Sequence, residues 1–386
     1  MTIAEILSNE DLRRHEFPVT AGKTFLAHAA VCPLPRRVSE AMRDYAARAA
    51  LGDQDESLTM AQIRRARELG AQLLHAQPEE IAFVGPTSLA LSYVAAGLPW
   101  RKGDNVLIYF DDYPSNVYPW MALAERGVEV RLLNAREYGR IRAIDVIGQV
   151  DEQTRLVALA SNHFVAGWRL ELDAIGRSLR ERNILFCVDG IQTVGAFPTS
   201  VEHVDFLAAD AHKWLLGPCG AGIFYVCQAM QEKLRPMVHG WHNVRCPGFV
   251  AQEQLVYLPD ARRYEAGSAN LAGLIGLSAA MELLLEVGVE NIAAELLRKR
   301  ALLLPALREQ GWDVLQAGAP ASNASAILSI YKPGADMAEW HRKLMEAQIH
   351  TSLREDRQGR RYVRLSPHFY NTDAELRRLL EALARS

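Results

Sequence analysis

The chain has 386 residues, of which 49% are hydrophobic, and this predicts one large domain with a substantial core plus a smaller second domain. Its 43 Lys and Arg residues against 46 Asp and Glu residues give a net charge of −3 without a block of like charge. That balance argues against nucleic acid and anionic membranes as partners and favours a small molecule. The five cysteines are scattered and predict no disulfide framework. Because no apolar run reaches membrane-spanning length and Met1 to Phe17 has no apolar leader pattern, we expect a cytoplasmic protein.

From about Val38 to Val226, short apolar runs alternate with segments of helical periodicity. This alternation predicts an α/β fold whose sheet is mostly parallel, seven-stranded and covered by helices on both faces. The expected strands are Ile81–Val84, Val106–Tyr109, Val128–Leu133, Leu156–Ala160, Ile184–Val188, Phe206–Ala209 and Gly222–Val226. The clearest helical segments are Leu58–His75, Leu89–Gly97, Asn116–Arg126 and Leu172–Arg182.

Beyond Leu271 the pattern changes to a long helical stretch, roughly Ile275–Gln310, followed by short strands and a closing helix. This predicts a smaller α+β domain over residues 276–386 and a large domain over residues 31–275. Residues 1–30 are expected to contribute to the active site and to the small domain. The expected C-terminal elements are strands Ala326–Ile330, Ile349–Leu353 and Tyr362–Leu365 and helix Asp373–Ala384.

Two chemically active side chains follow apolar runs typical of buried strands. Asp189 comes directly after Ile184–Val188, and Lys213 lies just past Phe206–Ala209. Taken singly, such a lysine is usually a solvated loop charge and Asp-Gly is usually a turn. Because ligands of open α/β sheets bind at the carboxyl ends of the strands, we expect both side chains in one crevice. A lysine that forms a Schiff base and a carboxylate that keeps a pyridine nitrogen protonated together predict a pyridoxal phosphate enzyme.

The run Gly85-Pro86-Thr87-Ser88 separates an expected strand from an expected helix. With Gly85 as the cap and Pro86 as the first helical residue, the amides of Thr87 and Ser88 are free to bind a phosphate at the positive helix end. The same residues also suit an ordinary helix start. The glycines of Gly217–Gly222 precede a strand instead of opening a helix, so they predict a tight turn and no dinucleotide site.

Seven motifs, in order and spanning nearly the whole chain, resemble the class V aminotransferase family of fold type I pyridoxal phosphate enzymes. That family includes cysteine desulfurases and kynureninase-like and isopenicillin N epimerase-like proteins. The resemblance implies the fold type I architecture, with a large cofactor-binding domain and a small C-terminal domain. The segments that carry it are Phe25–Ala30, Gly85–Ser88, Pro114–Trp120, Val188–Gln192, Ala211–Trp214, Tyr264–Asn270 and Val363–Pro367.

The resemblance implies Lys213 as the Schiff-base lysine and Asp189 as the partner of the pyridine nitrogen. It also implies a homodimer, because the family's counterpart of Ser268 reaches the phosphate of the neighbouring subunit. Asp210, where desulfurases commonly have a phosphate-binding serine, is left without a role. The other cofactor contacts that it implies come from Thr87, Ser88 and His212 at the phosphate, Gln192 near the ring hydroxyl, Tyr113 against the ring, and Phe164 where many desulfurases have asparagine.

Arg364 matches the arginine with which the family binds the substrate carboxylate, and a guanidinium fork suits that group. Arg354 is a second candidate, and the resemblance places Ala29 among the substrate-binding residues. No metal ligand set is expected. One departure is informative: desulfurases carry a reactive cysteine before the arginine motif, whereas residues 348–364 contain no cysteine. Persulfide chemistry at that loop is therefore not expected, and Cys246 is interpreted as an ordinary thiol.

The hypothesised reaction starts when a small L-amino acid replaces Lys213 in the Schiff base and Lys213 then removes the Cα proton. The short, cysteine-free loop favours a Cβ lyase that cleaves a C–S or related side-chain bond in a cysteine-like or kynurenine-like substrate. Two alternatives are a class V aminotransferase and an amino-acid epimerase. A remote alternative is a non-catalytic binding protein that kept the fold.

Overall fold

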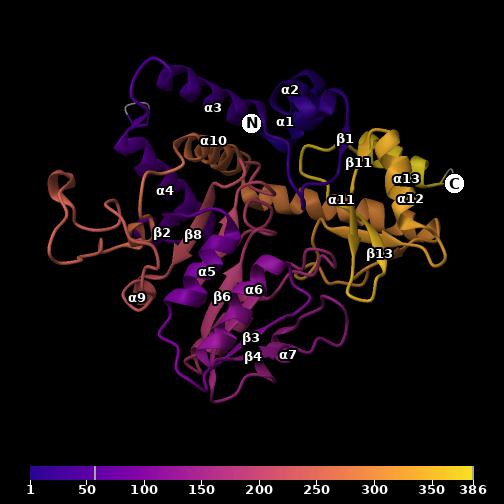
Figure 1. Cartoon of the computed structure of the whole chain (residues 1–386). Coiled ribbons are helices and arrows are strands. Elements are labelled where there is room, and N and C mark those ends of the chain that lie inside the picture. The colour runs from indigo at the N-terminus through magenta and orange to yellow at the C-terminus, as the bar shows by residue number, and fades with distance from the viewer. Residues whose placement is uncertain (56–57, 385–386) are drawn as a thin grey trace.

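The centre of the molecule is a seven-stranded sheet in the order β2-β8-β7-β6-β5-β3-β4 (Figure 1). This structure is a computed structural model that describes residues 1–55 and 58–384. The pairs from β7 to β4 are parallel, whereas β8 runs antiparallel to both β2 and β7, so the prediction of a mostly parallel sheet is confirmed. The strands are β2 (Ile81–Phe83), β3 (Asn105–Ile108), β4 (Glu129–Leu132), β5 (Thr154–Ala160), β6 (Leu185–Asp189), β7 (Phe206–Asp210) and β8 (Gly222–Val226).

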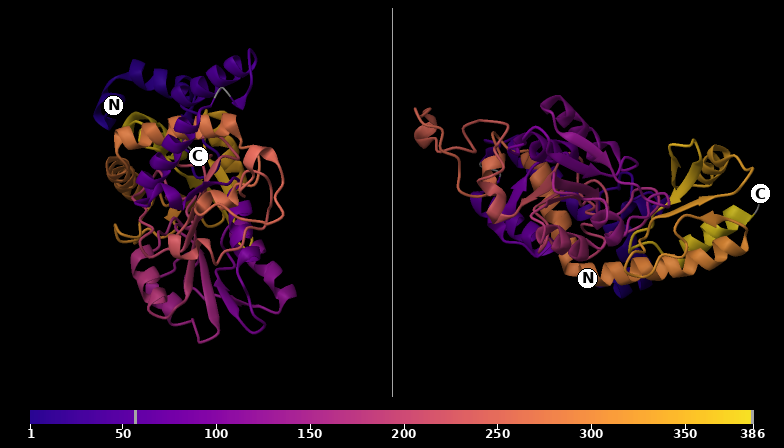
Figure 2. Two further views of the ribbon diagram at one scale, coloured as in Figure 1. Left: turned by 90° about the vertical axis from the view of Figure 1, so that its left-hand side faces the viewer. Right: turned by 90° about the horizontal axis from the view of Figure 1, so that it is seen from below.

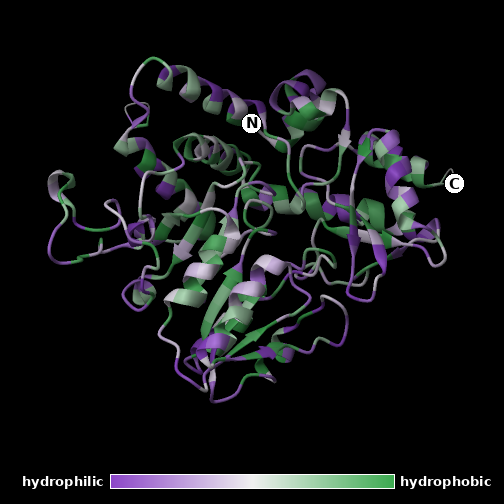
Figure 3. Cartoon of the chain, in the orientation of Figure 1, coloured by the Kyte–Doolittle hydropathy of each residue, from purple (hydrophilic) through white to green (hydrophobic). Residues whose placement is uncertain are grey.

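Helices cover the sheet on both faces, as the alternation of its side chains requires. Successive side chains of a strand point to opposite faces. Leu207 of β7 accordingly packs with residues of α4, α8 and α10, while the next residue, Ala208, packs with residues of α5 and α6. Hydrophobic residues dominate the central strands and α10 (Figure 3). These helices are α4 (Met60–Leu74), α5 (Thr87–Gly97), α6 (Tyr118–Met121), α8 (Leu172–Arg180) and α10 (Leu271–Val287); α7 (Ala143–Ile147) and α9 (Gln228–Gln231) are short.

Two predicted helices are divided in the structure. Residues 116–126 do not form one helix: 3₁₀ turns at Pro114–Asn116 and Ala122–Arg126 flank the four-residue α6. Pro119 is consistent with this division, because a residue without an amide hydrogen suits the first turn of a helix and not its interior. The stretch expected at 275–310 is also two helices, α10 and α11 (Val289–Glu309), separated by Gly288 at φ +87°. A positive φ is accessible to glycine at little cost and ends the first helix.

The bend between α10 and α11 is 75°. Within residues 1–55 and 58–384, no single helix is both long and apolar enough to cross a membrane, although this bent pair meets the length and composition requirements when its two helices are taken together.

The C-terminal part contains a four-stranded antiparallel sheet in the order β12-β13-β10-β9, and α11 extends from the central part along it (Figure 2). The strand predicted at 349–353 is two strands, because β11 pairs with β1 near the N-terminus while β12 pairs with β13. The boundary expected between residues 275 and 276 falls inside α10 and stays a prediction. The elements are β9 (Asp313–Val314), β10 (Leu328–Tyr331), α12 (Met337–Glu346), β11 (Ile349–His350), β12 (Ser352–Glu355), β13 (Arg361–Leu365) and α13 (Asp373–Ala384).

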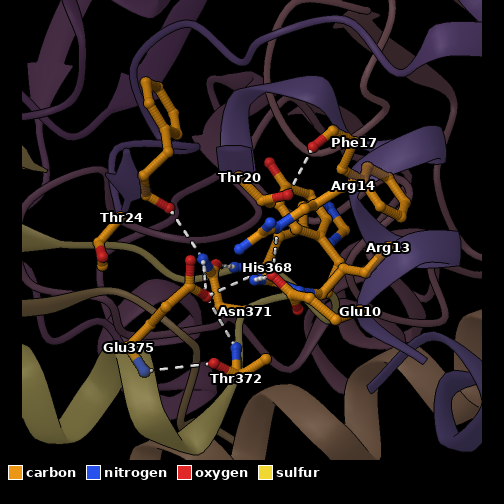
Figure 4. A network of polar contacts seen from close by, with 12 residues as sticks. Glu10, Arg13, Arg14, Phe17, Thr20, Thr24, His368, Asn371, Thr372 and Glu375 are labelled. Carbon is orange, nitrogen blue, oxygen red and sulfur yellow. Dashed lines mark hydrogen bonds and ion pairs between the residues drawn. The ribbon is translucent and has the colours of Figure 1, made fainter. Parts of the chain in front are cut away.

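The N-terminal segment is tied to the C-terminal part through a polar network (Figure 4). Arg13 forms ion pairs with Glu10 and Glu375, and Asn371 Nδ2 donates to the Phe25 carbonyl at 3.2 Å. These contacts hold the strand that leads to Ala29 against the body of the molecule. The segment comprises α1 (Ile3–Ser8), α2 (Glu10–Glu16), a 3₁₀ turn at Pro18–Ala21, β1 (Thr24–Phe25) and α3 (Arg36–Ala49); α1 and α2 were not predicted.

Candidate active site

A cavity of about 260 Å³ lies at the carboxyl ends of β6 and β7. The strands are parallel neighbours, with Asp189 of β6 opposite Ala208 of β7, so the residues that follow them meet at one edge of the sheet. Every predicted site residue except Gln192 and Ser268 lines this cavity. Its lining residues are Ala29, Ala30, Val31, Pro86, Thr87, Ser88, Tyr113, Ser115, Phe164, Asp189, Ile191, His212, Lys213, Arg354 and Arg364.

Lys213 is a buried lysine, 6% exposed, with its Nζ 5.2 Å from the centroid of the Tyr113 ring. Burial, together with the positive charges of Arg364 and Arg354, lowers its pKa to about 8 against the opposing effect of Asp189. A minor fraction of the amine, about a tenth at pH 7, is therefore unprotonated, far more than for an ordinary lysine. An unprotonated lysine amine is able to attack an aldehyde and to accept a proton.

Asp189 is 2% exposed, and its Oδ1 accepts a hydrogen bond of 3.1 Å from the Ile191 amide. Burial raises its pKa, while Lys213, that amide and His212 act in the opposite direction. Within the described part of the chain, Oδ2 accepts no hydrogen bond. A protonated pyridine nitrogen would give this carboxylate the charged donor that it lacks, so the residue fits the predicted role.

The N-terminus of α5 borders the cavity beside Thr87 and Ser88. Helical backbone begins at Thr87, and the cap is Pro86, with φ −77° and ψ 171°, which corrects the expectation of Gly85. The amides of Thr87 and Ser88 have no backbone partner among the described residues, as an anion site requires. A glycine is needed at position 85 because the backbone passes close to Gly220 there. A Cβ on residue 85 would lie 2.7 Å from the carbonyl carbon of Gly220.

His212, the other predicted phosphate ligand, is held by Asp210. Oδ2 of Asp210 accepts hydrogen bonds from His212 Nδ1 at 2.7 Å and from the Gly220 amide at 3.1 Å, and the Asp210 amide donates to Thr87 Oγ1 at 3.0 Å. Sequence reasoning left Asp210 without a role. The signal that was missed is the position of a carboxylate two residues before the histidine, at the point where the strand ends.

Arg364 is 1% exposed and lines the cavity with an unpaired donor edge. Its Nη1 donates to the Phe164 carbonyl at 2.7 Å, while its Nε and Nη2 are buried without a partner among the described residues. These two atoms form the planar edge with which arginine binds a carboxylate through two parallel hydrogen bonds. Burial lowers the pKa of Arg364, and nearby Arg354 adds to this effect, so an anion in the cavity would relieve an uncompensated charge.

Gln192 and Ser268 lie outside the cavity lining. Gln192 Oε1 accepts from Trp214 Nε1 at 2.8 Å, and its Nε2 donates to the Ala29 carbonyl at 3.1 Å, so this side chain braces two other segments. Its contact with a ring hydroxyl stays a prediction. Ser268 lines a separate cavity of about 190 Å³ together with Gly85 and Gly220, both of which adjoin the predicted phosphate site.

The region that carries the reactive cysteine in desulfurases is a short hairpin here. β12 ends at Glu355 and β13 begins at Arg361, so a five-residue connection, 356–360, joins them. Residues 348–364 contain no cysteine, and Cys246 does not line the cavity. No thiol of the described residues lines the cavity in its place.

The residues of the cavity fit pyridoxal phosphate as a group. An amine with a lowered pKa, a buried carboxylate that lacks a charged partner, and a helix N-terminus beside a histidine match the aldehyde, the ring nitrogen and the phosphate of that cofactor. Asp210 does not contradict the fit, because its contacting oxygen faces His212 and the Gly220 amide.

Comparison with known proteins agrees with this chemistry. The aminotransferase class-V family matches residues 24–379. A probable cysteine desulfurase of Methanothermobacter thermautotrophicus is 31% identical, and the match covers 98% of each chain. A structure of the cystine C-S lyase C-DES with its product cysteine persulfide has a TM-score of 0.86 at 22% identity, covering 96% of this chain and 99% of that chain. A C-DES variant with glycine covalently linked to its pyridoxal phosphate cofactor has a TM-score of 0.85 at 22% identity, with the same coverage.

The structural likeness shows a common fold, and the family match covers most of the chain. Enzymes of this family depend on pyridoxal phosphate, whose chemical requirements the cavity meets. The chain belongs to the aminotransferase class-V family and is a pyridoxal phosphate-dependent enzyme of fold type I.

Proposed function

We propose that this enzyme is a Cβ lyase that cleaves a C–S or related side-chain bond of a small L-amino acid. The observation that carries the proposal is the presence of Lys213 and the open edge of Arg364 in one cavity beside a cysteine-free hairpin. Such a site is equipped to bind an α-amino acid and to remove its Cα proton. It has no thiol at the hairpin to receive sulfur from the substrate.

Each residue has a defined task in this proposal. Arg364 binds the α-carboxylate through its Nε and Nη2 atoms, which orients the Cα–H bond. Lys213, once its amine is free, accepts the Cα proton, and its lowered pKa suits that role near neutral pH. Bound pyridoxal phosphate supplies an electron sink for the carbanion, and Asp189 maintains the positive charge on the cofactor ring on which this depends.

The bond changes balance without an external oxidant or reductant. The electron pair of the Cα–H bond forms a Cα=Cβ double bond, and the β substituent leaves with the electron pair of its bond to Cβ. A proton, such as the one held by Lys213, neutralises the leaving group. Water then hydrolyses the resulting enamine to ammonia and a 2-oxo acid, which is pyruvate when the substrate is cysteine-like.

The related proteins support this direction. The C-DES protein is a cystine C-S lyase, and the relative at 31% identity is a probable cysteine desulfurase, so both act at a C–S bond. The desulfurase loop cysteine is absent from this chain, which favours the lyase outcome over transfer of sulfur to an enzyme thiol.

A homodimer is part of the proposal. Residues 236–258 project from the body of the molecule (Figures 1 and 2), and their exposed apolar side chains are typical of a protein–protein contact. Ser268 lies next to the predicted phosphate site but outside its lining, as expected for a residue that serves the other subunit. The exposed side chains are Met237, Val238, Trp241, Phe249, Val250, Leu255 and Val256.

A product assay tests the reaction type. Holoenzyme is incubated with single L-amino acids without a keto acid acceptor while pyruvate, ammonia, alanine, sulfide and pyridoxamine phosphate are measured together. We expect pyruvate and ammonia in equal amounts with the cofactor unchanged. Stoichiometric pyridoxamine phosphate would indicate an aminotransferase instead, and inversion at Cα without cleavage would indicate an epimerase. Lys213→Ala should abolish the products, whereas Cys246→Ser, outside the cavity, should retain them.

A further inference from the structure

The active-site cavity contains one arginine more than an α-carboxylate requires. Arg354 and Arg364 both line it. In the antiparallel pair β12–β13, Arg364 is opposite Ser352 and Arg354 is opposite Tyr362. Because side chains alternate along a strand, Arg354 and Arg364 lie on the same face of the sheet as diagonal neighbours. The Cα atoms of such neighbours are about 7–8 Å apart.

Neither of these arginines has an acidic partner among the described residues. Arg354 Nη1 donates to the Leu353 carbonyl at 2.9 Å, and its Nε is buried without a partner. Two other arginines of the same hairpin are neutralised: Arg357 pairs with Asp111 at 2.7 Å and Arg361 with Glu355 at 2.8 Å. The remaining arginine of the hairpin, Arg360, is exposed to solvent and lies over the Tyr331 ring, so Arg354 and Arg364 differ from it in lining the cavity.

An unpaired, largely buried guanidinium is costly unless a ligand neutralises it. One carboxylate at Arg364 leaves Arg354 uncompensated. The cofactor phosphate is already provided for by the α5 N-terminus and by His212. The positive charge of Arg354 is therefore neutralised only if the substrate itself carries a second anionic group.

We propose that Arg354 binds a carboxylate on the substrate side chain, so that the preferred substrates are L-amino acids whose leaving group carries a carboxylate beyond Cβ. This inference rests on the proposed function and names its substrate class. Neutral side chains would leave Arg354 without a partner, and cationic side chains would be repelled. Arg354 is then the residue that selects the substrate, whereas Arg364 binds the group common to all amino acids.

Binding of acids that have no amino group tests this without turnover. Succinate, glutarate and butyrate are titrated into the holoenzyme by calorimetry at constant ionic strength, because screening weakens charge pairs. We expect at least one of the two dicarboxylates to bind about tenfold or more tightly than butyrate. Arg354→Gln should remove this difference while leaving butyrate affinity unchanged, and Arg354→Lys should restore part of it. Arg357→Gln, which alters a paired arginine outside the lining, is the matched control and should behave as the wild type.

Equal affinities of mono- and dicarboxylates in the wild type would overturn the inference. So would an equal loss of butyrate and dicarboxylate binding in Arg354→Gln, which would assign Arg354 to the α-carboxylate. A loss of pyridoxal phosphate affinity in that variant would assign it to the cofactor phosphate and would also overturn the inference. These acids do not react, so their binding does not depend on the reaction type. The binding test therefore stands even if the product assay contradicts the lyase proposal.

Discussion

Asp210 accepts a hydrogen bond from His212, with 2.7 Å between Oδ2 and Nδ1. Asp210 is 2% exposed, and its Oδ2 also accepts from the Gly220 amide. The hydrogen bond commits Nδ1 of His212 and leaves Nε2 as the nitrogen available to a phosphate. An acid at this position is thus compatible with an anion site, because it acts through the histidine that it orients.

The first prediction concerns this pair. Asp210→Ala should weaken pyridoxal phosphate binding about tenfold, since His212 loses its acceptor and a charged hydrogen bond contributes about 1.5–3 kcal/mol. The measurement is a titration of the apo protein followed by the absorption of bound cofactor. Pyridoxal, which has no phosphate, is the control ligand. If its affinity falls as much as that of the phosphorylated form, His212 does not act at the phosphate.

The second prediction concerns the ionisation of Lys213. The reaction of apo protein with acetic anhydride at Lys213, quantified by mass spectrometry, should rise with pH with a midpoint near 8, where half of the amine is unprotonated. Arg354→Gln removes a positive charge that lowers this pKa, so its profile should move to higher pH. Asp189→Asn removes a negative charge that raises it, so its profile should move to lower pH. Shifts of both variants in the same direction would contradict the assignment of these charges.

The third prediction tests the contribution of Ser268 across a subunit interface. Lys213→Ala and Ser268→Ala homodimers are each prepared, then mixed and allowed to exchange subunits at limiting pyridoxal phosphate. If Ser268 serves the other subunit, each mixed dimer contains one site with both Lys213 and Ser268 intact, and activity should rise above that of either parent. If Ser268 acts within its own subunit, mixing restores nothing. Mixing Lys213→Ala with itself is the baseline.

The fourth prediction concerns Asp112, a buried carboxyl beside the site. Burial raises its pKa to about 7, although its Oδ2 accepts hydrogen bonds from the Ala160 amide at 3.0 Å and from Asn116 Nδ2 at 3.2 Å. Between the unfolded pKa of 3.8 and about 7, the folded protein holds a proton that the unfolded chain has lost, so stability falls as pH rises through this range.

Asp112→Asn removes that titration. From pH 5 to pH 8 its free energy of unfolding should therefore rise relative to the wild type by about 1–3 kcal/mol, measured by denaturant unfolding. Asp111→Asn is the matched control, because Asp111 is partly exposed and pairs with Arg357. A stability difference between Asp112→Asn and the wild type that does not change with pH would refute the raised pKa.

The fold was largely predictable because its determinants are local. The expected strands fall within one or two residues of β2 to β8, since apolar runs between helical segments are a property of short stretches of sequence. The exceptions have identifiable causes at single residues. Pro119 divided one expected helix and Gly288 another, and the pairing of β11 with the distant β1 divided an expected strand.

The sequence by itself determined the chemistry that the site is able to perform. The positions of Asp189 and Lys213 after adjacent parallel strands bring an acid and an amine to one edge of the sheet, because the ends of such strands carry ligand sites. Residue type and position after an apolar run were sufficient for that inference.

The tertiary structure alone decided which polar groups are already paired. Gln192 bonds to Ala29, 163 positions away, and Arg364 bonds to Phe164, 200 positions away. Pairing across such separations depends on packing and burial, which no local pattern specifies. It is this pairing that gives Asp210 a role through His212 and leaves Arg354 and Arg364 as cavity-lining arginines without an acidic partner among the described residues.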